Sequence, residues 1–94
     1  MVMISELIRG HTEAIILSLL LKEDSYGYKI NQTIEHVTNG ALILNEATLY
    51  SVFKRLENNH HIQSYWQEGF NHINRKYYSN TEQGLTYLEE HKKS

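Results

Sequence analysis

The chain has 94 residues, no cysteine, no proline and a formal net charge of −2 at pH 7. This length is enough for one domain with a modest core, and the absence of cysteine excludes disulfides, thiolate metal sites and cysteine nucleophiles. The longest apolar run, residues 14–21, is too short to cross a bilayer and has no basic segment before it, so we expect a cytoplasmic protein without a membrane segment or secretory signal.

The first predicted helix covers about residues 5–22 and is apolar around most of its circumference. Its apolar residues cover an arc of roughly 240°, whereas an ordinary surface helix has a stripe of about 100°. They are Ile15, Ile16, Leu17, Leu19, Leu20 and Leu21. Because a small domain can hardly cover so wide an arc, we predict that this helix serves both the core and a homodimer interface. A central helix buried within its own domain is the alternative.

A second helix is predicted to follow, with Asp24 or Ser25 as its N-terminal cap. Its apolar residues recur at i, i+4 and i+7: Ile30, Ile34 and Val37. The pair Asn39-Gly40 should end it, because glycine adopts the left-handed conformation found after helix C-termini without steric cost.

The third predicted helix has two distinct faces and begins after Asn45, a good N-cap residue. The apolar face occupies an arc of about 100° and consists of Leu49, Val52, Phe53 and Leu56. The opposite face carries Ala47, Ser51, Lys54 and Asn58, flanked by Tyr50 and Arg55. A DNA-recognition helix needs one side anchored in a core, and small or hydrogen-bonding side chains on the other. This pattern therefore favours a recognition helix.

A hairpin and a final helix complete the predicted elements. Residues 62–66 alternate with period two and are rich in aromatics, and residues 75–79 form the return strand. Ser79 and Glu82 fit a capping box, with Thr81 as the competing cap, ahead of a helix that carries Leu85 and Leu88 on one face. The expected fold class is mainly α (α+β): a winged helix-turn-helix with a two-stranded β wing and a C-terminal dimerisation helix.

The charge distribution is weakly favourable to nucleic-acid binding, although a net charge of −2 counts against a strongly basic surface. Residues 45–80 contain four Lys or Arg residues and three Glu residues, which gives +1, so the remaining residues carry −3.

Several short motifs follow one another along the chain. They are Gly27-Tyr28-Lys29-Ile30, Asn45-Glu46-Ala47-Thr48-Leu49-Tyr50, Phe53-Lys54-Arg55-Leu56-Glu57, Ser64-Tyr65-Trp66, Arg75-Lys76-Tyr77-Tyr78 and Thr81-Glu82-Gln83-Gly84. In this order and spacing they resemble the PadR family of bacterial transcriptional regulators, and the similarity covers roughly residues 6–88.

The resemblance implies a dimeric repressor that binds double-stranded DNA at a near-palindromic operator, with no enzymatic activity. It divides the chain into a DNA-binding domain, residues 1–80, and a C-terminal helix, residues 81–94, that contributes to dimerisation. The DNA-contact candidates are Thr48, Tyr50, Ser51, Lys54 and Arg55 on the third helix and Arg75 and Lys76 on the wing. The dimer candidates are Leu7, Ile16, Leu20, Leu85 and Leu88. Some members bind planar aromatic compounds between subunits, so a small aromatic effector is a further expectation.

Two single positions and one segment depart from the family pattern. Ser51 stands where proline is common, and His60 stands where many members have a helix-ending glycine. In the wing, residues 71–74 replace a tip rich in glycine and arginine, so fewer phosphate contacts should follow.

Other readings of the same residues remain open. Tyr50 can pack on the second helix instead of contacting DNA, and Trp66 is expected to pack under the wing. The histidines show no metal-ligand spacing, and phosphate-loop and nucleophile motifs are absent, so we expect no metal, no cofactor and no enzyme. The functional alternative is a winged-helix protein-interaction module without direct DNA binding.

Overall fold

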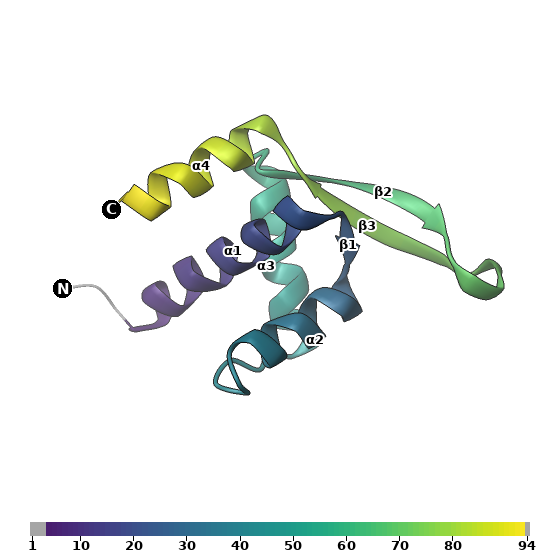
Figure 1. The fold of residues 1–94 in the computed structure, drawn as a ribbon, viewed down its shortest axis with the longest axis horizontal. Coiled ribbons are helices and arrows are strands. Elements are labelled where there is room, and N and C mark those ends of the chain that lie inside the picture. The colour runs from purple at the N-terminus through teal and green to yellow at the C-terminus, as the bar shows by residue number, and fades with distance from the viewer. Residues whose placement is uncertain (1–3, 94) are drawn as a thin grey trace.

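The computed structural model describes the backbone of residues 4–93 and the side chains of residues 11–91. Its elements in chain order are α1 (Ile4–Lys22), β1 (Ser25–Tyr26), α2 (Gly27–Val37), α3 (Glu46–Asn58), β2 (Ile62–Glu68), the 3₁₀ turn η1 (Phe70–His72), β3 (Asn74–Asn80) and α4 (Glu82–Lys93). The helices gather at one end and the β2–β3 hairpin projects from them (Figure 1). This arrangement confirms the predicted α+β winged helix.

The sheet has three antiparallel strands in the order β1-β3-β2. The two residues of β1 pair with Tyr78 and Tyr77 of β3, and the rings of Tyr26 and Tyr77 lie 5.3 Å apart. The prediction that Asp24 or Ser25 caps α2 was wrong, because Ser25 is a strand residue and the N-cap is Tyr26, which makes no side-chain cap bond. Asp24 instead accepts a hydrogen bond of 2.6 Å from the hydroxyl of Tyr65.

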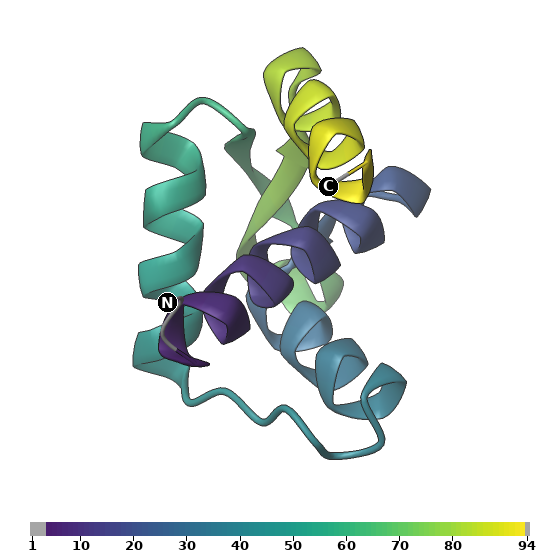
Figure 2. The same ribbon diagram turned by 90° about the vertical axis from the view of Figure 1, so that its left-hand side faces the viewer.

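The core lies where α1 crosses the other helices and the inner end of the hairpin (Figure 2). The four apolar residues of α3 that were predicted to face the core are at most 5% exposed. Phe53 stacks on Tyr78 of β3 with ring centroids 4.2 Å apart, which joins α3 to the sheet. The wide apolar arc of α1 is divided: Ile16, Leu17 and Leu20 are buried, whereas Leu21 is 49% exposed.

The ends of α2 and α3 are set by local hydrogen bonds. Gly40 follows α2 with a φ of 79°, as predicted for a helix-ending glycine, and its N–H donates to Glu35 O at 2.8 Å. Asn45 Oδ1 accepts from the backbone N–H of Thr48 at 2.8 Å and caps α3, which confirms that prediction. His60 follows α3 with a φ of 62°, so a non-glycine residue takes the left-handed position.

The start of α4 is joined to the turn that follows α3. Thr81 Oγ1 accepts from the N–H of Gly84 at 3.0 Å and donates to the carbonyl of His60 at 2.5 Å. Thr81 is therefore the cap, and the capping box predicted from Ser79 was wrong because Ser79 pairs with Gln63 in the sheet. Within residues 4–93, no helix is long and apolar enough to span a membrane.

Candidate nucleic-acid interface

One side of α3 is exposed and polar, opposite the side that packs in the core. Thr48, Ser51 and Lys54 recur every three residues on this side, and all three are exposed. The backbone there is fixed by the Asn45 cap and by the buried apolar face. No ion pair involving Lys54 is found within the described residues. Its ammonium group is therefore available to an external anion.

Arg55 lies on a different side of α3 from Lys54. Its Nε donates to Glu13 Oε1 of α1 at 2.5 Å, and the Arg55 side chain is 32% exposed. The hydroxyl of Tyr87, on α4, donates to Glu13 Oε2 at 3.2 Å. Burial, followed by the charge of Glu13, raises the pKa of Tyr87. The guanidinium of Arg55 is thus paired with the Glu13 carboxylate, whereas the sequence motifs placed Arg55 among the residues that contact DNA.

Tyr50 makes the packing contact that the sequence left as an alternative. Its ring lies edge-on to Phe53 with centroids 5.6 Å apart, and its hydroxyl lies over Gly27, the first residue of α2. A Cβ atom at Gly27 would be 2.7 Å from that hydroxyl, so glycine is needed for the close approach. Tyr50 remains 43% exposed, which leaves part of the side chain free for a further contact.

The two wing cations are half-buried against aromatic rings. The guanidinium carbon of Arg75 lies 4.5 Å from the ring centroid of Tyr26, a cation–π distance. Lys76 Nζ lies 3.9 Å from Glu57 Oε1 and 5.7 Å from the ring centroid of Tyr78. Both cations lie in the outer part of the hairpin, where Lys76 pairs with Trp66 and Arg75 pairs with Gln67, and they face β1 and α3.

The outer hairpin differs from the sequence expectation at Trp66, which is 69% exposed instead of packed under the wing. Trp66 lies four residues after Ile62 on β2 and therefore on the same face of the strand, but Ile62 is covered by the core and Trp66 is not. At the tip, Asn71 and His72 both have a positive φ, and His72 pairs with Glu68. Residues 67–74 contain no Lys or Arg, so the tip adds no cation to the interface.

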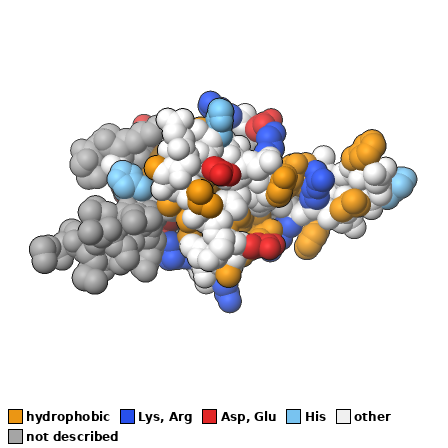
Figure 3. Space-filling view, turned by 90° about the horizontal axis from the view of Figure 1, so that it is seen from below, with side chains coloured by type: hydrophobic (Ala, Val, Ile, Leu, Met, Phe, Trp, Pro, Cys, Tyr) orange, Lys and Arg blue, Asp and Glu red, His pale blue; other side chains and the backbone are white. Residues whose placement is uncertain are grey.

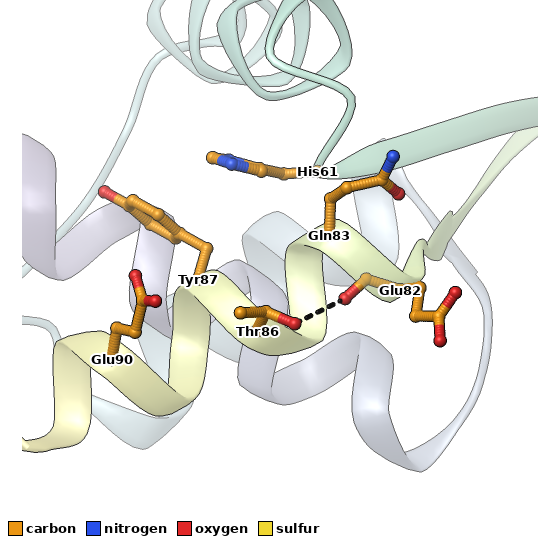
Figure 4. A pocket seen from close by; sticks show the side chains of 6 residues that line it. All are labelled: His61, Glu82, Gln83, Thr86, Tyr87 and Glu90. Carbon is orange, nitrogen blue, oxygen red and sulfur yellow. Dashed lines mark hydrogen bonds between the residues drawn. The ribbon is translucent and has the colours of Figure 1, made fainter.

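A separate cavity of about 480 Å³ lies along α4, next to the turn after α3 (Figure 4). His61 and Tyr87 both line it and stack on each other with ring centroids 4.3 Å apart, and Glu82 and Glu90 make the lining acidic. Among the described residues, no group of three or more His, Cys, Asp or Glu side chains could hold a metal ion. The acidic lining makes this cavity unsuited to DNA phosphate.

The residues predicted to form a dimer interface occupy different environments. Ile16, Leu20 and Leu88 are at most 4% exposed within a single chain, so a second copy would gain no further burial from them. Leu85 is 42% exposed on α4. The side chain of Leu7 lies outside the described residues.

Comparisons with known proteins agree with this geometry. The model of the transcriptional regulator PadR-like family matches residues 16–90. A relative from Lysinibacillus sphaericus, named protein X, is 46% identical over 86 residues, which are 92% of this chain and 79% of the relative. The transcriptional regulator YqjI of Escherichia coli is 30% identical over 83 residues, which are 88% of this chain but only 38% of that protein.

A solved structure shows the same fold. The transcriptional regulator Cth-833 from Clostridium thermocellum superimposes with a TM-score of 0.81 at 44% identity, over 90% of this chain and 82% of that one. The family consists of transcriptional regulators and not of enzymes. With most of its length matched to the family model and to these relatives, the chain belongs to the PadR-like family of transcriptional regulators.

Proposed function

We propose that the protein is a repressor that binds a near-palindromic operator as a homodimer. The observation that carries the proposal is the exposed side of α3, where Thr48, Ser51 and Lys54 project from a helix whose other side is fixed in the core. Side chains of these types donate hydrogen bonds to base edges and phosphates in the major groove. In a two-fold dimer, two such helices would enter successive major grooves about 34 Å apart.

In this proposal the candidate residues take three roles. Thr48, Ser51 and Lys54 contact the major groove, while Tyr50, Arg75 and Lys76 contact the flanking backbone. Arg55 positions α3 through Glu13. Three cations per subunit then remain for DNA, so a dimer would neutralise about six phosphates and log K should fall with log salt at a slope of about −5.

The DNA-binding unit comprises residues 1–80 in this proposal, and residues 81–94 contribute to the dimer through the exposed Leu85. Release of DNA by a small aromatic effector would act by changing the spacing of the two α3 helices. The contacts of Glu13 with Arg55 and Tyr87 favour such a route, because they join α4 to α3 through one carboxylate. Operator binding places the protein in the cytoplasm.

A gel shift with the DNA upstream of the protein's own gene tests the proposal. We expect a shifted complex that weakens steeply with salt and that is weaker in the Lys54→Ala variant than in the wild type. Lys22→Ala is the matched control, because Lys22 is exposed at the end of α1, outside the proposed interface. Absence of binding at low salt by a folded dimer would contradict the proposal and favour a winged helix used for protein association.

A further inference from the structure

A groove of about 330 Å³ separates the hairpin from the first turns of α2 and α3. Its principal lining residues are Gly27, Tyr28, Tyr50, Trp66, Arg75 and Lys76. Tyr28 and Trp66 are each 69% exposed, so two large aromatic side chains stand on the groove without cover from the fold. On the face seen in Figure 3, apolar side chains and Lys or Arg side chains are interspersed along the hairpin.

The strand register explains why Trp66 overlooks this groove. Trp66 pairs with Lys76, and two residues further in Ser64 pairs with Tyr78, so these four side chains share one face of the hairpin. The inner part of that face contacts α3, because Tyr78 stacks on Phe53 and Ser64 Oγ donates to Glu57 at 3.0 Å. Trp66 and Lys76 continue the same face outward, beyond the core.

The chemistry of the groove is cationic and aromatic. Arg75 and Lys76 line it, whereas no carboxylate of the described side chains does; Glu57 lies 3.9 Å from Lys76 but is not a lining residue. The indole N–H of Trp66 and the hydroxyls of Tyr28 and Tyr50 are hydrogen-bond donors. Their ring faces are apolar surfaces. An occupant that offers anionic oxygens together with apolar C–H groups fits both parts of this surface.

The groove is continuous with the exposed side of α3. Tyr50 and Lys54 are separated by four residues on that helix and therefore lie one above the other. Gly27 lets the Tyr50 hydroxyl lie at the base of the groove, because a Cβ there would come within 2.7 Å of it. An elongated anion that contacts Tyr50 can thus extend along α3 to Lys54.

We propose that this groove holds one sugar–phosphate strand of the bound DNA. Trp66 and Tyr28 contact the deoxyribose faces and donate to phosphate oxygens, and Arg75 and Lys76 balance the phosphate charge. This inference rests on the proposed function and adds to it two contact residues, Tyr28 and Trp66, that the sequence motifs did not assign to DNA. It also makes Trp66 a reporter located inside the interface.

Trp66 is the only tryptophan in the chain, so its fluorescence tests the groove directly. The upstream DNA is added to the full chain while binding is followed by the anisotropy of labelled DNA and, separately, by Trp66 emission and its quenching by acrylamide. We expect Trp66 to become shielded from acrylamide over the same range of DNA concentration as the anisotropy rises. If the anisotropy rises while Trp66 stays fully quenchable, the proposal that DNA occupies the groove is overturned and the proposal that the protein binds DNA stands. No rise in anisotropy would overturn both proposals.

Three conservative variants add an affinity measurement. Tyr28→Phe and Trp66→Phe keep an aromatic ring but remove the donor, and each should weaken binding about tenfold, as expected for a lost hydrogen bond to a charged acceptor. Tyr65→Phe is the matched control, because Tyr65 alternates with Trp66 along β2 and its hydroxyl donates to Asp24. Equal DNA affinities of all three folded variants would contradict DNA binding in the groove, as would a loss of affinity confined to Tyr65→Phe.

Discussion

Arg55 Nε of α3 lies 2.5 Å from Glu13 Oε1 of α1, and Glu13 is only 8% exposed. The second carboxylate oxygen of Glu13 accepts from the hydroxyl of Tyr87, on α4, at 3.2 Å. One buried carboxylate therefore joins the proposed recognition helix to the first and last helices. The orientation of α3 depends on charge neutralisation inside the domain as well as on apolar packing.

Replacing Glu13 by Gln should lower the free energy of unfolding by about 2 kcal/mol, because the variant leaves a partly buried guanidinium without its counter-charge. Urea unfolding followed by circular dichroism measures the change. Glu23→Gln is the control: Glu23 pairs with Lys29 at 2.8 Å, but both side chains are at least half-exposed, so little should change. Equal losses of unfolding free energy in the two variants would show that the Glu13–Arg55 pair stabilises the fold no more than the exposed Glu23–Lys29 pair does.

Lys54→Ala and Arg55→Ala should have different consequences although the residues are adjacent. Lys54 is exposed, so its loss should weaken operator binding, reduce the salt slope by about 2 for a dimer and leave unfolding unchanged. Arg55→Ala should lower the free energy of unfolding, since it leaves the buried carboxylate of Glu13 without its counter-charge. DNA titrations at several salt concentrations, together with urea unfolding, separate the two. A normal unfolding curve for Arg55→Ala would mean that the ion pair does not stabilise the fold.

Gly84→Ala should be strongly destabilising, even though alanine is the better helix former. A Cβ at Gly84 would lie 2.0 Å from the carbonyl oxygen of His61, and that oxygen also accepts the N–H of Thr81 at 3.2 Å. Since the backbone must move, we expect the free energy of unfolding to fall by about 3 kcal/mol. This loss exceeds the gain of about 1 kcal/mol from the higher helix propensity of alanine. Gln83→Ala, an exposed neighbour, should stay within about 0.5 kcal/mol of the wild type. Similar unfolding midpoints for both variants would contradict this close contact.

The sequence predicted the features of the fold that depend on local spacing. The buried residues of α3 follow from one helical period, and the Asn45 cap needs only a side chain that reaches the Thr48 N–H. Both are decided within a few residues, so no knowledge of the remaining chain is required. The same holds for Gly40 after α2.

Contacts between distant residues could not be predicted in this way. The sequence motifs treated Lys54 and Arg55 alike, and the difference arises from Glu13, which lies 42 residues away from Arg55. With only two residues, β1 is too short to show a periodic sequence pattern. It is a strand because β3 lies beside it and pairs with it. The exposure of Trp66 likewise depends on how far the hairpin extends beyond α3, which the period-two pattern does not encode.

Stability should fall at alkaline pH in part through Tyr78. Burial of its ring, with the nearby charges of Glu57 and Tyr50, raises the pKa of Tyr78 from 10.0 to about 12. The neutral hydroxyl is thus favoured in the folded state, and this stabilisation is complete below pH 10 and is lost as the pH rises towards 12. Tyr78→Phe cannot ionise, so urea unfolding should show a smaller loss across this window than in the wild type. An identical loss would show that Tyr78 does not contribute to the alkaline transition.

Leu85→Asp should convert the proposed dimer to a monomer without unfolding it. Leu85 is 42% exposed in a single chain, so a carboxylate there remains hydrated in the monomer but would be desolvated in an apolar interface. Light scattering should give twice the monomer mass of 11.1 kDa for the wild type and the monomer mass for the variant. Thr86→Asp, exposed at the next position of α4, controls for the added charge. A monomeric wild type would remove the basis for a two-fold operator, whereas a dimeric Leu85→Asp variant would move the interface to another surface, with the exposed Leu21 of α1 as the next residue to replace.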